Sequence, residues 1–178
     1  MLTTEDFKKH IEVLSNGKYL SYDEGKSAFE YIMTGNATDI LISSFLTSLK
    51  IIFINSGISH DLIAAGADIM REKAIKIKAS DDTIDIVGTG GDGHNTLNIS
   101  TATALVISGT GIKVAKHGNY SASSMSGSAD VLISLGINIK NDISNVQKCL
   151  DECGICFLFA PKHHSAMKHV CLLYTSPS

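Results

Sequence analysis

The sequence predicts an α/β protein in which a small helical domain precedes part of a larger domain with a mostly parallel central sheet. Two observations carry this prediction. Up to about residue 80, apolar residues recur at helical spacing between capping signals. After Asp82, short β-branched runs, glycine-rich turns and helical stretches alternate. The polar stretch 75–82 is the best boundary, so we expect a helical domain over residues 1–78 and an α/β domain over 79–170.

The first two helices of the helical domain have clear start and stop signals. Thr4 is placed to cap a helix whose first turn is acidic, and Gly17 is placed to end it. Ser21 and Glu24 have the spacing of a capping box at the start of the second helix, which Gly35 would end.

The third helix follows Thr38 and is apolar nearly all round. This pattern predicts burial on several sides, either by neighbouring helices or by a second subunit. Hydroxyl side chains and Lys50 interrupt the apolar run 40–54, which therefore falls short of the ~20 apolar residues of a membrane span. A fourth helix is expected from about His60 to Ala79.

The second domain is expected to alternate strands with helices, as parallel sheets do. The predicted strands are 83–87, 112–115 and 156–160, and the predicted helices are 101–108, 128–135 and 144–153.

Composition excludes several classes of protein. The 178 residues include 15 basic and 18 acidic side chains, without a Lys/Arg cluster of the kind that binds nucleic acid. A hydrophobic content of 44% argues against disorder. The charged start, which includes Glu5 and Asp6, lacks the apolar core of a signal peptide. We therefore expect a cytoplasmic protein with no membrane segment, no nucleic-acid partner and reduced cysteines.

Two loops carry the residues suited to chemistry. The first, Gly88-Thr-Gly-Gly-Asp-Gly93, follows a predicted strand and precedes a helix that opens near Asn98. Glycine lets the backbone approach a phosphate, and a helix amino terminus supplies aligned amides. The P-loop lysine is missing, and no carboxylate stands about 20 residues further on, where a dinucleotide fingerprint places one.

The second loop runs from Lys116 to Asp130 and holds five serines between positions 121 and 128. Serine hydroxyls donate to phosphate oxygens, and Lys116 supplies a point charge. Loops that follow neighbouring parallel strands meet at one edge of the sheet, where open α/β sheets bind ligands.

Together the two loops resemble those of the anthranilate phosphoribosyltransferases. The matching motifs are Gly-Thr-Gly-Gly-Asp-Gly-x-x-Thr-x-Asn-Ile-Ser-Thr at 88–101 and Lys-His-Gly-Asn-x-Ser-x-Ser-Ser-x-Ser-Gly-Ser-Ala-Asp at 116–130. The helical start and the segment 157–170 also look like this family, so the resemblance covers residues 1–170. It implies a cytoplasmic, homodimeric transferase of tryptophan biosynthesis. Such an enzyme moves a phosphoribosyl group from phosphoribosyl pyrophosphate (PRPP) to anthranilate with Mg²⁺, giving N-(5-phosphoribosyl)anthranilate and pyrophosphate.

The resemblance also implies roles for particular residues. PRPP would contact Gly88, Gly91, Asp92, Thr96, Asn98, Ile99, Ser100, Thr101, Lys116, His117, Gly118, Asn119, Ser121, Ser123, Ser124 and Ser128. Anthranilate would contact Gly88, His117 and Asn119, and Ser100 would also contact Mg²⁺. Catalysis of this kind stabilises charge on the leaving pyrophosphate, so no residue is assigned as a covalent nucleophile.

The chain departs from the family at three positions. Tyr120 and Tyr174 stand where the family has arginines, and Met125 stands where it often has lysine. Residues 171–178 look like a foreign or truncated tail, and the family continues for about as much chain again. We therefore expect the chain to be the amino-terminal half of an enzyme and to be inactive alone.

Two other functions stay open from the sequence: a relative of the pyrimidine nucleoside phosphorylases, and a non-catalytic relative that binds nucleic acid or another anion. Several smaller motifs have structural interpretations. The C-x-x-C run 153–156 is typical of a core segment, and Asp81 and Asp82 of a solvated turn. His163 and His164 are interpreted as surface or capping residues. Asp130 is expected to anchor the second loop.

Overall fold

A computed structural model describes residues 2–88, 97–121 and 126–170. These residues form two compact units. The helical unit contains the chain up to Ala74 together with the described residues from Ala166 on, and the α/β unit contains Ile75–Ser165. The boundary therefore falls ahead of the one expected after Lys78.

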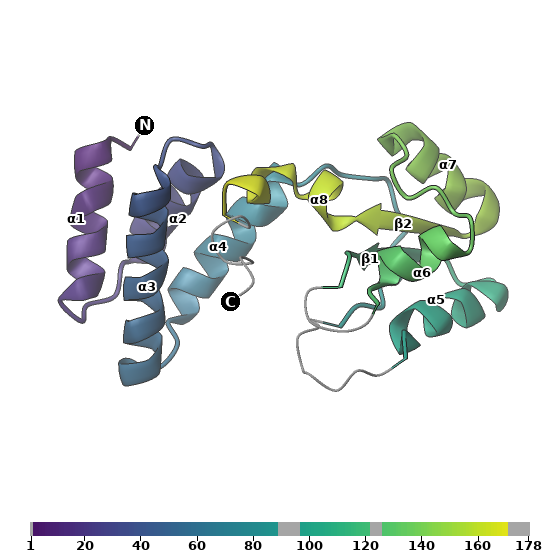
Figure 1. Cartoon of the computed structure of the whole chain (residues 1–178), viewed down its shortest axis with the longest axis horizontal. Coiled ribbons are helices and arrows are strands. Elements are labelled where there is room, and N and C mark those ends of the chain that lie inside the picture. Colours follow the sequence, from purple (N-terminus) through teal and green to yellow (C-terminus); the bar gives the residue numbers. More distant parts are fainter. Residues whose placement is uncertain (1, 89–96, 122–125, 171–178) are drawn as a thin grey trace. The chain divides into compact units, whose positions relative to one another are not determined.

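Four helices make up the helical unit: α1 (Thr4–Ser15), α2 (Tyr22–Met33), α3 (Asp39–Ser56) and α4 (His60–Lys73) (Figure 1). Each begins at a hydroxyl residue whose oxygen accepts a backbone N–H of the first turn, and these residues are Thr3, Ser21, Thr38 and Ser59. The capping box of Ser21 and Glu24 is confirmed. The cap predicted at Thr4 is wrong by one residue, because the side chain of Thr3 accepts from the backbone N–H of Asp6 instead.

The fourth helix is shorter than predicted and ends at Lys73. Ala74 is already extended, with ψ of 143°. The following Ile-Lys-Ile-Lys alternates with the period of extended chain, and the Ile75 N–H donates to the His163 carbonyl at 2.9 Å. Segment 75–79 thus belongs to the α/β unit in place of extending α4.

An aromatic cluster forms the centre of the helical core. The Phe45 ring is fully buried, with its centroid 5.4 Å from that of Phe7 and 5.7 Å from that of Phe29. The Tyr31 ring also packs against Phe7, with a centroid distance of 5.1 Å, and its hydroxyl lies 2.8 Å from the Thr4 hydroxyl. Helix α1 packs against α3, and α2 packs against α4.

Helix α3 is less buried than its apolar composition predicts. Phe45, Ile42 and Ile52 are buried, whereas Ile40 is 78% exposed and Ile54 is 73% exposed. Among the described residues, α3 is the helix that is long and apolar enough to cross a membrane by length and composition. A core helix of a soluble bundle passes the same test, and the buried side of α3 is built into such a core. Its other side is apolar, and the described residues leave Ile40 and Ile54 on it exposed.

Two parallel strands form the sheet of the α/β unit, β1 (Val114–Gly118) and β2 (Ile155–Phe159), paired from Val114↔Ile155 to Gly118↔Phe159. A parallel sheet is therefore confirmed. Both strands are shifted from the predicted ranges, β1 later in the chain and β2 by one residue earlier.

The strand predicted over 83–87 is wrong, because only Ile84 joins the sheet, through a parallel bridge to Val114. After Ile84, side chains replace the backbone–backbone hydrogen bonds that would continue the strand. The Asp85 carboxylate accepts from the His117 backbone N–H at 3.0 Å, and Lys116 Nζ donates to the Ile86 carbonyl at 2.7 Å. These bonds explain why the extended segment is not a regular strand.

The remaining elements are α5 (Ile99–Gly109), α6 (Ser128–Ser134), α7 (Ile143–Cys153), α8 (Ala160–His163) and the 3₁₀ turn η1 (Ser165–Met167). Helix α7 covers one face of the strands, and α5 and α6 cover the other (Figure 1). Because side chains alternate along a strand, Cys156 and Leu158 pack with Leu150 of α7, whereas Phe157 packs with Leu132 of α6.

The described cysteines are free, and Cys156 is buried in this core. Burial is the main cause that raises the pKa of the Cys156 thiol to about 11. A buried protonated thiol next to an exposed Cys153 agrees with a structural interpretation of the C-x-x-C run.

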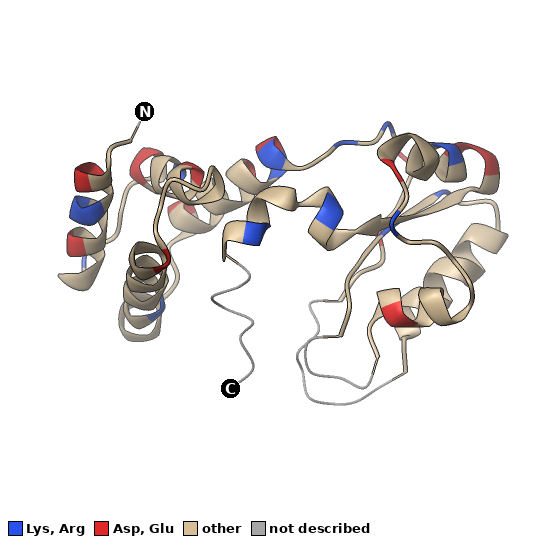
Figure 2. Ribbon diagram, turned by 45° about the horizontal axis from the view of Figure 1, so that its top comes forward, with Lys and Arg blue, Asp and Glu red and all other residues tan. Residues whose placement is uncertain are grey.

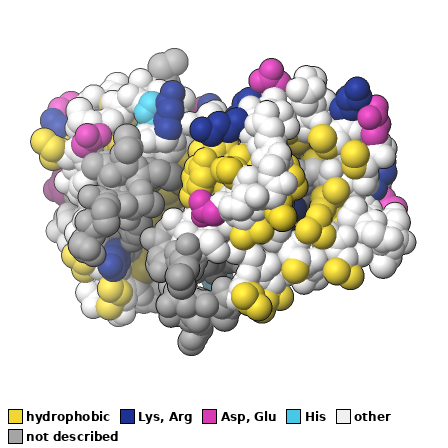
Figure 3. Space-filling view, turned by 45° about the vertical axis from the view of Figure 1, so that its right-hand side comes forward, with side chains coloured by type: hydrophobic (Ala, Val, Ile, Leu, Met, Phe, Trp, Pro, Cys, Tyr) yellow, Lys and Arg dark blue, Asp and Glu magenta, His cyan; other side chains and the backbone are white. Residues whose placement is uncertain are grey.

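Apolar surface is plentiful on the α/β unit. Helix α5 carries no charged residue (Figure 2). Exposed apolar side chains on α5 and around α6 include Leu97, Ile99, Val106, Leu135 and Ile137. The space-filling view shows several yellow apolar areas on one face of the molecule (Figure 3). Such exposure is typical of a surface that further chain or another subunit covers.

Candidate functional site

The two loops singled out in the sequence are joined by one side chain. Asn98 precedes α5, and its side chain makes no capping bond to that helix. Its amide Nδ2 instead donates to the Ser126 carbonyl at 3.2 Å and to the Ser126 hydroxyl at 3.0 Å. The end of the first loop is thus fastened to the second loop, as expected for loops that follow neighbouring parallel strands.

Asp130 organises the second loop. Its Oδ2 accepts from the Gly127 backbone N–H at 2.7 Å and from the Ser121 backbone N–H at 3.2 Å. The anchoring role expected for Asp130 is confirmed. A Cβ at Gly127 would overlap the backbone of Asn119, Tyr120 and Ser121, so the loop closes on itself too tightly for any other residue.

Gly118 is equally constrained at the end of β1. A Cβ there would overlap the Ser128 hydroxyl and the Phe157 ring. The Ser128 hydroxyl in turn lies 3.4 Å from the Asn119 carbonyl, to which it donates. Residues 118, 119 and 128, all assigned to PRPP by the family resemblance, therefore pack together.

Lys116 is a buried cation, with an exposed fraction of 4%. Its Nζ donates to the carbonyls of Ile86 at 2.7 Å and His117 at 3.4 Å. Within the described segments no carboxylate lies within 4.0 Å of it. Burial lowers the pKa of the Lys116 ammonium, and nearby Asp85 opposes the shift. A buried ammonium with neutral acceptors only is costly, and a bound anion would offset that cost.

Thr101, in the first turn of α5, is the second buried polar residue of this region. Its hydroxyl is buried, and no described group hydrogen-bonds to it. Thr101 and Lys116 line the same cavity of about 120 Å³, whose other walls include Ala104, Leu132 and Phe157. The residue with the unsatisfied hydroxyl and the residue with the unpaired ammonium thus line one half-open cavity.

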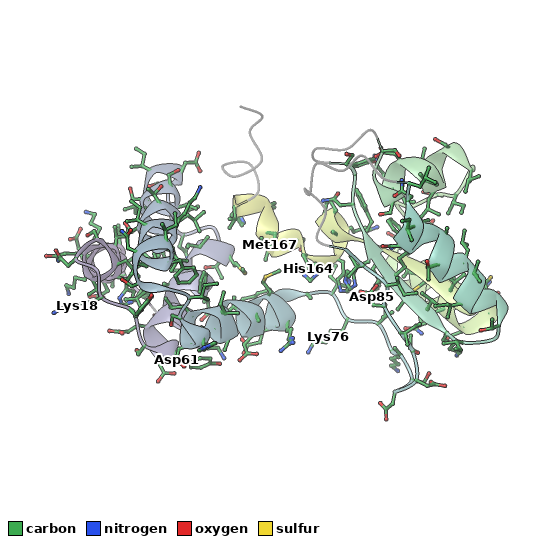
Figure 4. All side chains as sticks on the ribbon, turned by 90° about the horizontal axis from the view of Figure 1, so that it is seen from below. Lys18, Asp61, Lys76, Asp85, His164 and Met167 are labelled. Atoms are coloured by element: carbon green, nitrogen blue, oxygen red, sulfur yellow. The ribbon has the colours of Figure 1, made fainter. Side chains whose placement is uncertain are left out.

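His117 projects from the other face of β1 and is clamped by Asp85. The Asp85 carboxylate accepts from the His117 backbone N–H at 3.0 Å and lies 2.9 Å from its ring Nδ1. The His163 ring meets the His117 ring edge-on at a centroid distance of 4.7 Å, and the His164 ring stacks on it at 5.5 Å. Figure 4 shows Asp85 and His164 close together in this region.

The environments of His163 and His164 favour neutral rings. Burial, with smaller contributions from His117 and His164, lowers the pKa of His163 to about 4. Burial and His117 likewise lower the pKa of His164. The interpretation of His163 and His164 as surface or capping residues is incomplete: His164 caps α8, yet both rings are half-buried. The missed signal was their position directly after β2, at the sheet edge where His117 lies next to the last residue of β1.

Tyr120, which the family resemblance places at an expected arginine position, makes an apolar contact. Its ring meets the Phe159 ring edge-on at a centroid distance of 5.3 Å, and its backbone N–H donates to Asn119 Oδ1 at 2.8 Å. Tyr120 thus contributes a packing contact and a turn hydrogen bond at this position.

The structure brings together most described residues of the expected site. Asn98, Ile99, Ser100 and Thr101 form the start of α5, and the chain from Lys116 to Ser121 ends β1 and opens the second loop. Gly88 is exposed at the end of the described part of the first loop. The other expected residues, together with Met125 and Tyr174, lie outside the described residues: Gly91, Asp92, Thr96, Ser123 and Ser124.

Comparison with known families matches both units. Residues 8–74 match a family model described as the helical bundle domain of a glycosyl transferase family. Residues 80–174 match the a/b domain of a glycosyl transferase family. The chain belongs to this glycosyl transferase family.

Similar proteins in the glycosyl transferase family include curated anthranilate phosphoribosyltransferases. The protein of Rhodospirillum rubrum is 50% identical over 168 residues, and that of Parvibaculum lavamentivorans is 48% identical over 165 residues. These alignments cover 94% and 93% of this chain, and 47% of each relative. The chain thus spans about half the length of the curated relatives it matches.

Solved structures in the family have the same fold. A crystal structure of anthranilate phosphoribosyltransferase from Thermus thermophilus has a TM-score of 0.84 and 35% identity, over 95% of this chain and 51% of that one. The Saccharomyces cerevisiae enzyme in complex with PRPP and Mg has a TM-score of 0.84 and 29% identity, over 99% of this chain and 53% of that one.

Proposed function

We propose that this chain is the PRPP-binding half of an anthranilate phosphoribosyltransferase of tryptophan biosynthesis. The proposal rests on two observations: Asn98 and Ser126 fasten the two loops together, and the ammonium of Lys116 is buried without an opposite charge. The similarity to curated and solved enzymes of that name supports it. The complete enzyme would transfer the phosphoribosyl group of PRPP to the amino group of anthranilate.

The two loops would hold the phosphates and ribose of PRPP. The start of α5 offers backbone amides and the hydroxyls of Ser100 and Thr101, of which the Thr101 hydroxyl lacks a described partner. The second loop offers Lys116 and the serine hydroxyls, including Ser121 and Ser128. An anion would satisfy the buried groups that the protein by itself leaves unpaired.

Mg²⁺ fits this arrangement as a cofactor shared with the substrate. Mg²⁺ prefers oxygen ligands, and it is bound by few protein groups when phosphates supply the rest. Ser100 would hold it through its hydroxyl, beside the unpartnered hydroxyl of Thr101. Bound there, Mg²⁺ would neutralise charge on the pyrophosphate.

In the proposed reaction, the bond between the anomeric carbon and the pyrophosphate oxygen breaks with its electron pair on pyrophosphate. The anthranilate nitrogen forms the new bond to that carbon and loses a proton. Positive charge grows on the sugar and negative charge on the leaving group. The amides of α5, the hydroxyls of the second loop and the ammonium of Lys116 would stabilise the leaving group, so a covalent nucleophile is unnecessary.

Anthranilate would bind on the side of the site formed by Gly88, His117 and Asn119. Asp85 holds the His117 backbone and ring in one orientation, so this wall is fixed before the substrate arrives. The arginine that the related enzymes provide at position 174 is a tyrosine here. We expect weaker anthranilate binding than in an enzyme that has the arginine.

The complete protein is proposed to be a cytoplasmic homodimer that associates through residues 1–78. The uncovered apolar side of α3, with Ile40, Ile51 and Ile54 exposed, supports this role for the helical domain. Analytical ultracentrifugation should show a dimer for the wild-type chain and a monomer for Ile51→Lys. A wild-type monomer would contradict the proposal.

The main test is isothermal titration of a chain that continues past residue 170 with PRPP and Mg²⁺. Lys116→Met should weaken PRPP binding by at least about tenfold, because a charge-assisted bond to phosphate is worth about 1.5–3 kcal/mol. Lys113→Met, three residues earlier in the chain and half-buried, is the matched control. Absence of PRPP binding, or of pyrophosphate release that depends on anthranilate, would refute the proposal. Phosphorolysis of thymidine without PRPP would favour a nucleoside phosphorylase, and a salt-dependent gel shift would favour a nucleic-acid binder.

A further inference from the structure

The sheet of the α/β unit has an open edge along β2. Val114 of β1 donates its backbone N–H to the Gly154 carbonyl at 2.8 Å, so that carbonyl faces β1. Because backbone groups alternate in direction along a strand, the N–H and C=O of Ile155 and Phe157 and the N–H of Phe159 point away from β1. Within the described part of the chain, no backbone hydrogen bond reaches these groups. They form the kind of unpaired row to which a further strand can bind.

Two cavities lie along this open edge. The lining of the larger, about 120 Å³, includes β2 residues 155–157, and the lining of the smaller, about 30 Å³, includes residues 157–159. The larger cavity is also lined by Leu105 of α5 and Val146 of α7, helices that cover opposite faces of the sheet (Figure 1). Since a sheet separates its two faces, a cavity in contact with both faces lies beside an edge, where a next strand would run.

The walls of the larger cavity suit the apolar side chains of a strand. Leu105, Ile137 and Ile139 line it, and α5 carries no charged residue. Leu105 is 45% exposed and Ile137 is 44% exposed, so apolar surface is available there. Thr101 and Lys116, which also line this cavity, keep the role in phosphate binding proposed for them above. A strand with apolar residues at alternate positions would cover the apolar walls while its backbone pairs with β2.

The relatives indicate which polypeptide supplies such a strand. Each alignment covers 47% of the curated relative, so these proteins contain about as much chain again as this one. Sheets usually have about 4–6 strands, and a sheet of two strands is marginal in stability. The carboxyl-terminal half of a family member therefore has the length, and this sheet has the free edge, for further strands to be added.

We propose that the open edge of β2 is a docking surface for the carboxyl-terminal half of a family member, supplied as a separate polypeptide. One strand of that half pairs with residues 155–159, and its apolar side chains fill the two cavities. The proposal rests on membership of the family and on the geometry of β2. It does not depend on the transferase activity proposed above, so a failure to bind PRPP would refute that activity and leave this docking surface in place.

The test is co-expression of this chain, carrying an affinity tag, with the carboxyl-terminal half of the Rhodospirillum rubrum relative. The two halves of the Rhodospirillum rubrum protein, split at the corresponding position, are the positive control. We expect the partner half, identified by its mass, to be retained in equal amount with this chain, without PRPP or Mg²⁺. Association of the control halves without association of this chain would overturn the proposal.

Two lysine substitutions on α5 form a matched pair that locates the contact. Leu105→Lys places a charge at the larger cavity and should weaken association at least about tenfold, because covering an unpaired charge is costly. Val106→Lys changes the next residue, which is 70% exposed and lines neither cavity, and should associate as the wild type does. Unchanged association of Leu105→Lys would overturn the proposal. Far-UV circular dichroism of both variants confirms that the fold is retained.

Amide hydrogen exchange of the ¹⁵N-labelled chain tests the strand pairing itself. On association, the amides of Ile155, Phe157 and Phe159 should exchange at least about tenfold more slowly, because each gains a hydrogen bond. The amides of Cys156 and Leu158 lie on the side of β2 that already pairs with β1 and should change less. A complex in which none of the first three amides slows would place the contact elsewhere. Self-association of this chain that Leu105→Lys abolishes would assign the edge to a second copy, and either result would overturn the proposal.

Discussion

The two units of the chain begin their helices in different ways. Every helix of α1 to α4 has a hydroxyl cap that satisfies a backbone N–H of its first turn. Helices α5, α6 and α7 lack such a side-chain cap bond. At α5, Asn98 has the chemistry of a cap but is used to bind Ser126 of the other loop. In the helical unit, side-chain caps thus satisfy backbone N–H groups at the helix starts. In the α/β unit, the backbone N–H groups at the start of α5 are left without a side-chain cap and could bind a ligand.

The hydrophobic cores of the two units also differ. The helical unit has one core built around the Phe7, Phe29 and Phe45 rings. The described α/β unit has two small clusters on opposite faces of its two strands, and buries the polar residues Lys116 and Thr101 beside them. The first unit is organised for packing and the second for binding.

The largest expected effect tests the helical core. Phe45→Ala should lower the free energy of unfolding by about 3–5 kcal/mol, because a fully buried ring is lost and a cavity remains. Urea denaturation followed by circular dichroism measures it. Ile54→Ala, in the same helix but 73% exposed, is the control and should cost far less. Equal losses for the two variants would contradict the assignment of the core side of α3.

A smaller effect is expected in the second loop of the α/β unit. Gly127→Ala should cost about 1–3 kcal/mol, because the added Cβ meets backbone atoms that have no room to move. Thermal denaturation measures the loss. Gly109→Ala, at the end of α5 with open space around it, should change stability by less than about 0.5 kcal/mol. A Gly127→Ala variant as stable as wild type would show that the loop has room to open.

The helix starts themselves provide a matched pair. Ser21→Ala should cost about 1 kcal/mol, because it removes the capping box of α2. Asp142→Ala, at the corresponding position of α7, should cost less than about 0.5 kcal/mol. Asp142 makes no capping bond and pairs only with Lys162 at 3.0 Å on the surface. Chemical denaturation of both variants would reveal whether the contrast between the units is energetic as well as geometric.

The smallest effect concerns pH and the histidine cluster formed by His117, His163 and His164. The pKa of His163 is lowered to about 4 in the folded state, mainly by burial and then by His117 and His164. Between about pH 4 and pH 6.5 the unfolded chain therefore binds the proton more readily, so stability should fall as pH falls through this window. Asp85 is the carboxylate that faces the cluster through His117.

Melting temperatures measured from pH 7 to pH 4.5 test this, with His163→Gln as the comparison. The variant should show a shallower dependence on pH than the wild type. Identical slopes would mean that His163 titrates normally in the folded protein.

The sequence was sufficient for much of the fold because local signals and tertiary packing agree there. The capping box at Ser21 and the start of α3 after Thr38 are confirmed, and so is the parallel sheet. The motifs at 88–101 and 116–130 were also sufficient to identify the family, because glycine, serine and asparagine at fixed spacing are specific to phosphate-binding loops of this kind.

Where prediction from the sequence was wrong, contacts between distant residues decided the outcome. Segment 83–87 has strand composition, but the side chains of Asp85 and Lys116 replace the bonds of the ladder. The fourth helix ends at Lys73 because the next residues pair with the α/β unit. Helix periodicity showed that α3 is apolar on all sides, but it could not show which side this chain covers.

The sequence by itself determined the starts of α2 and α3, the order of the elements and the two loops, because these depend on residues close together in the chain. Only the tertiary structure decided that Lys116 is buried without an opposite charge, that Asn98 joins the two loops, and that three histidines meet behind Asp85. Parallel strands bring residues from positions 85, 117 and 163 to one edge of the sheet, and no periodicity within a segment records that meeting.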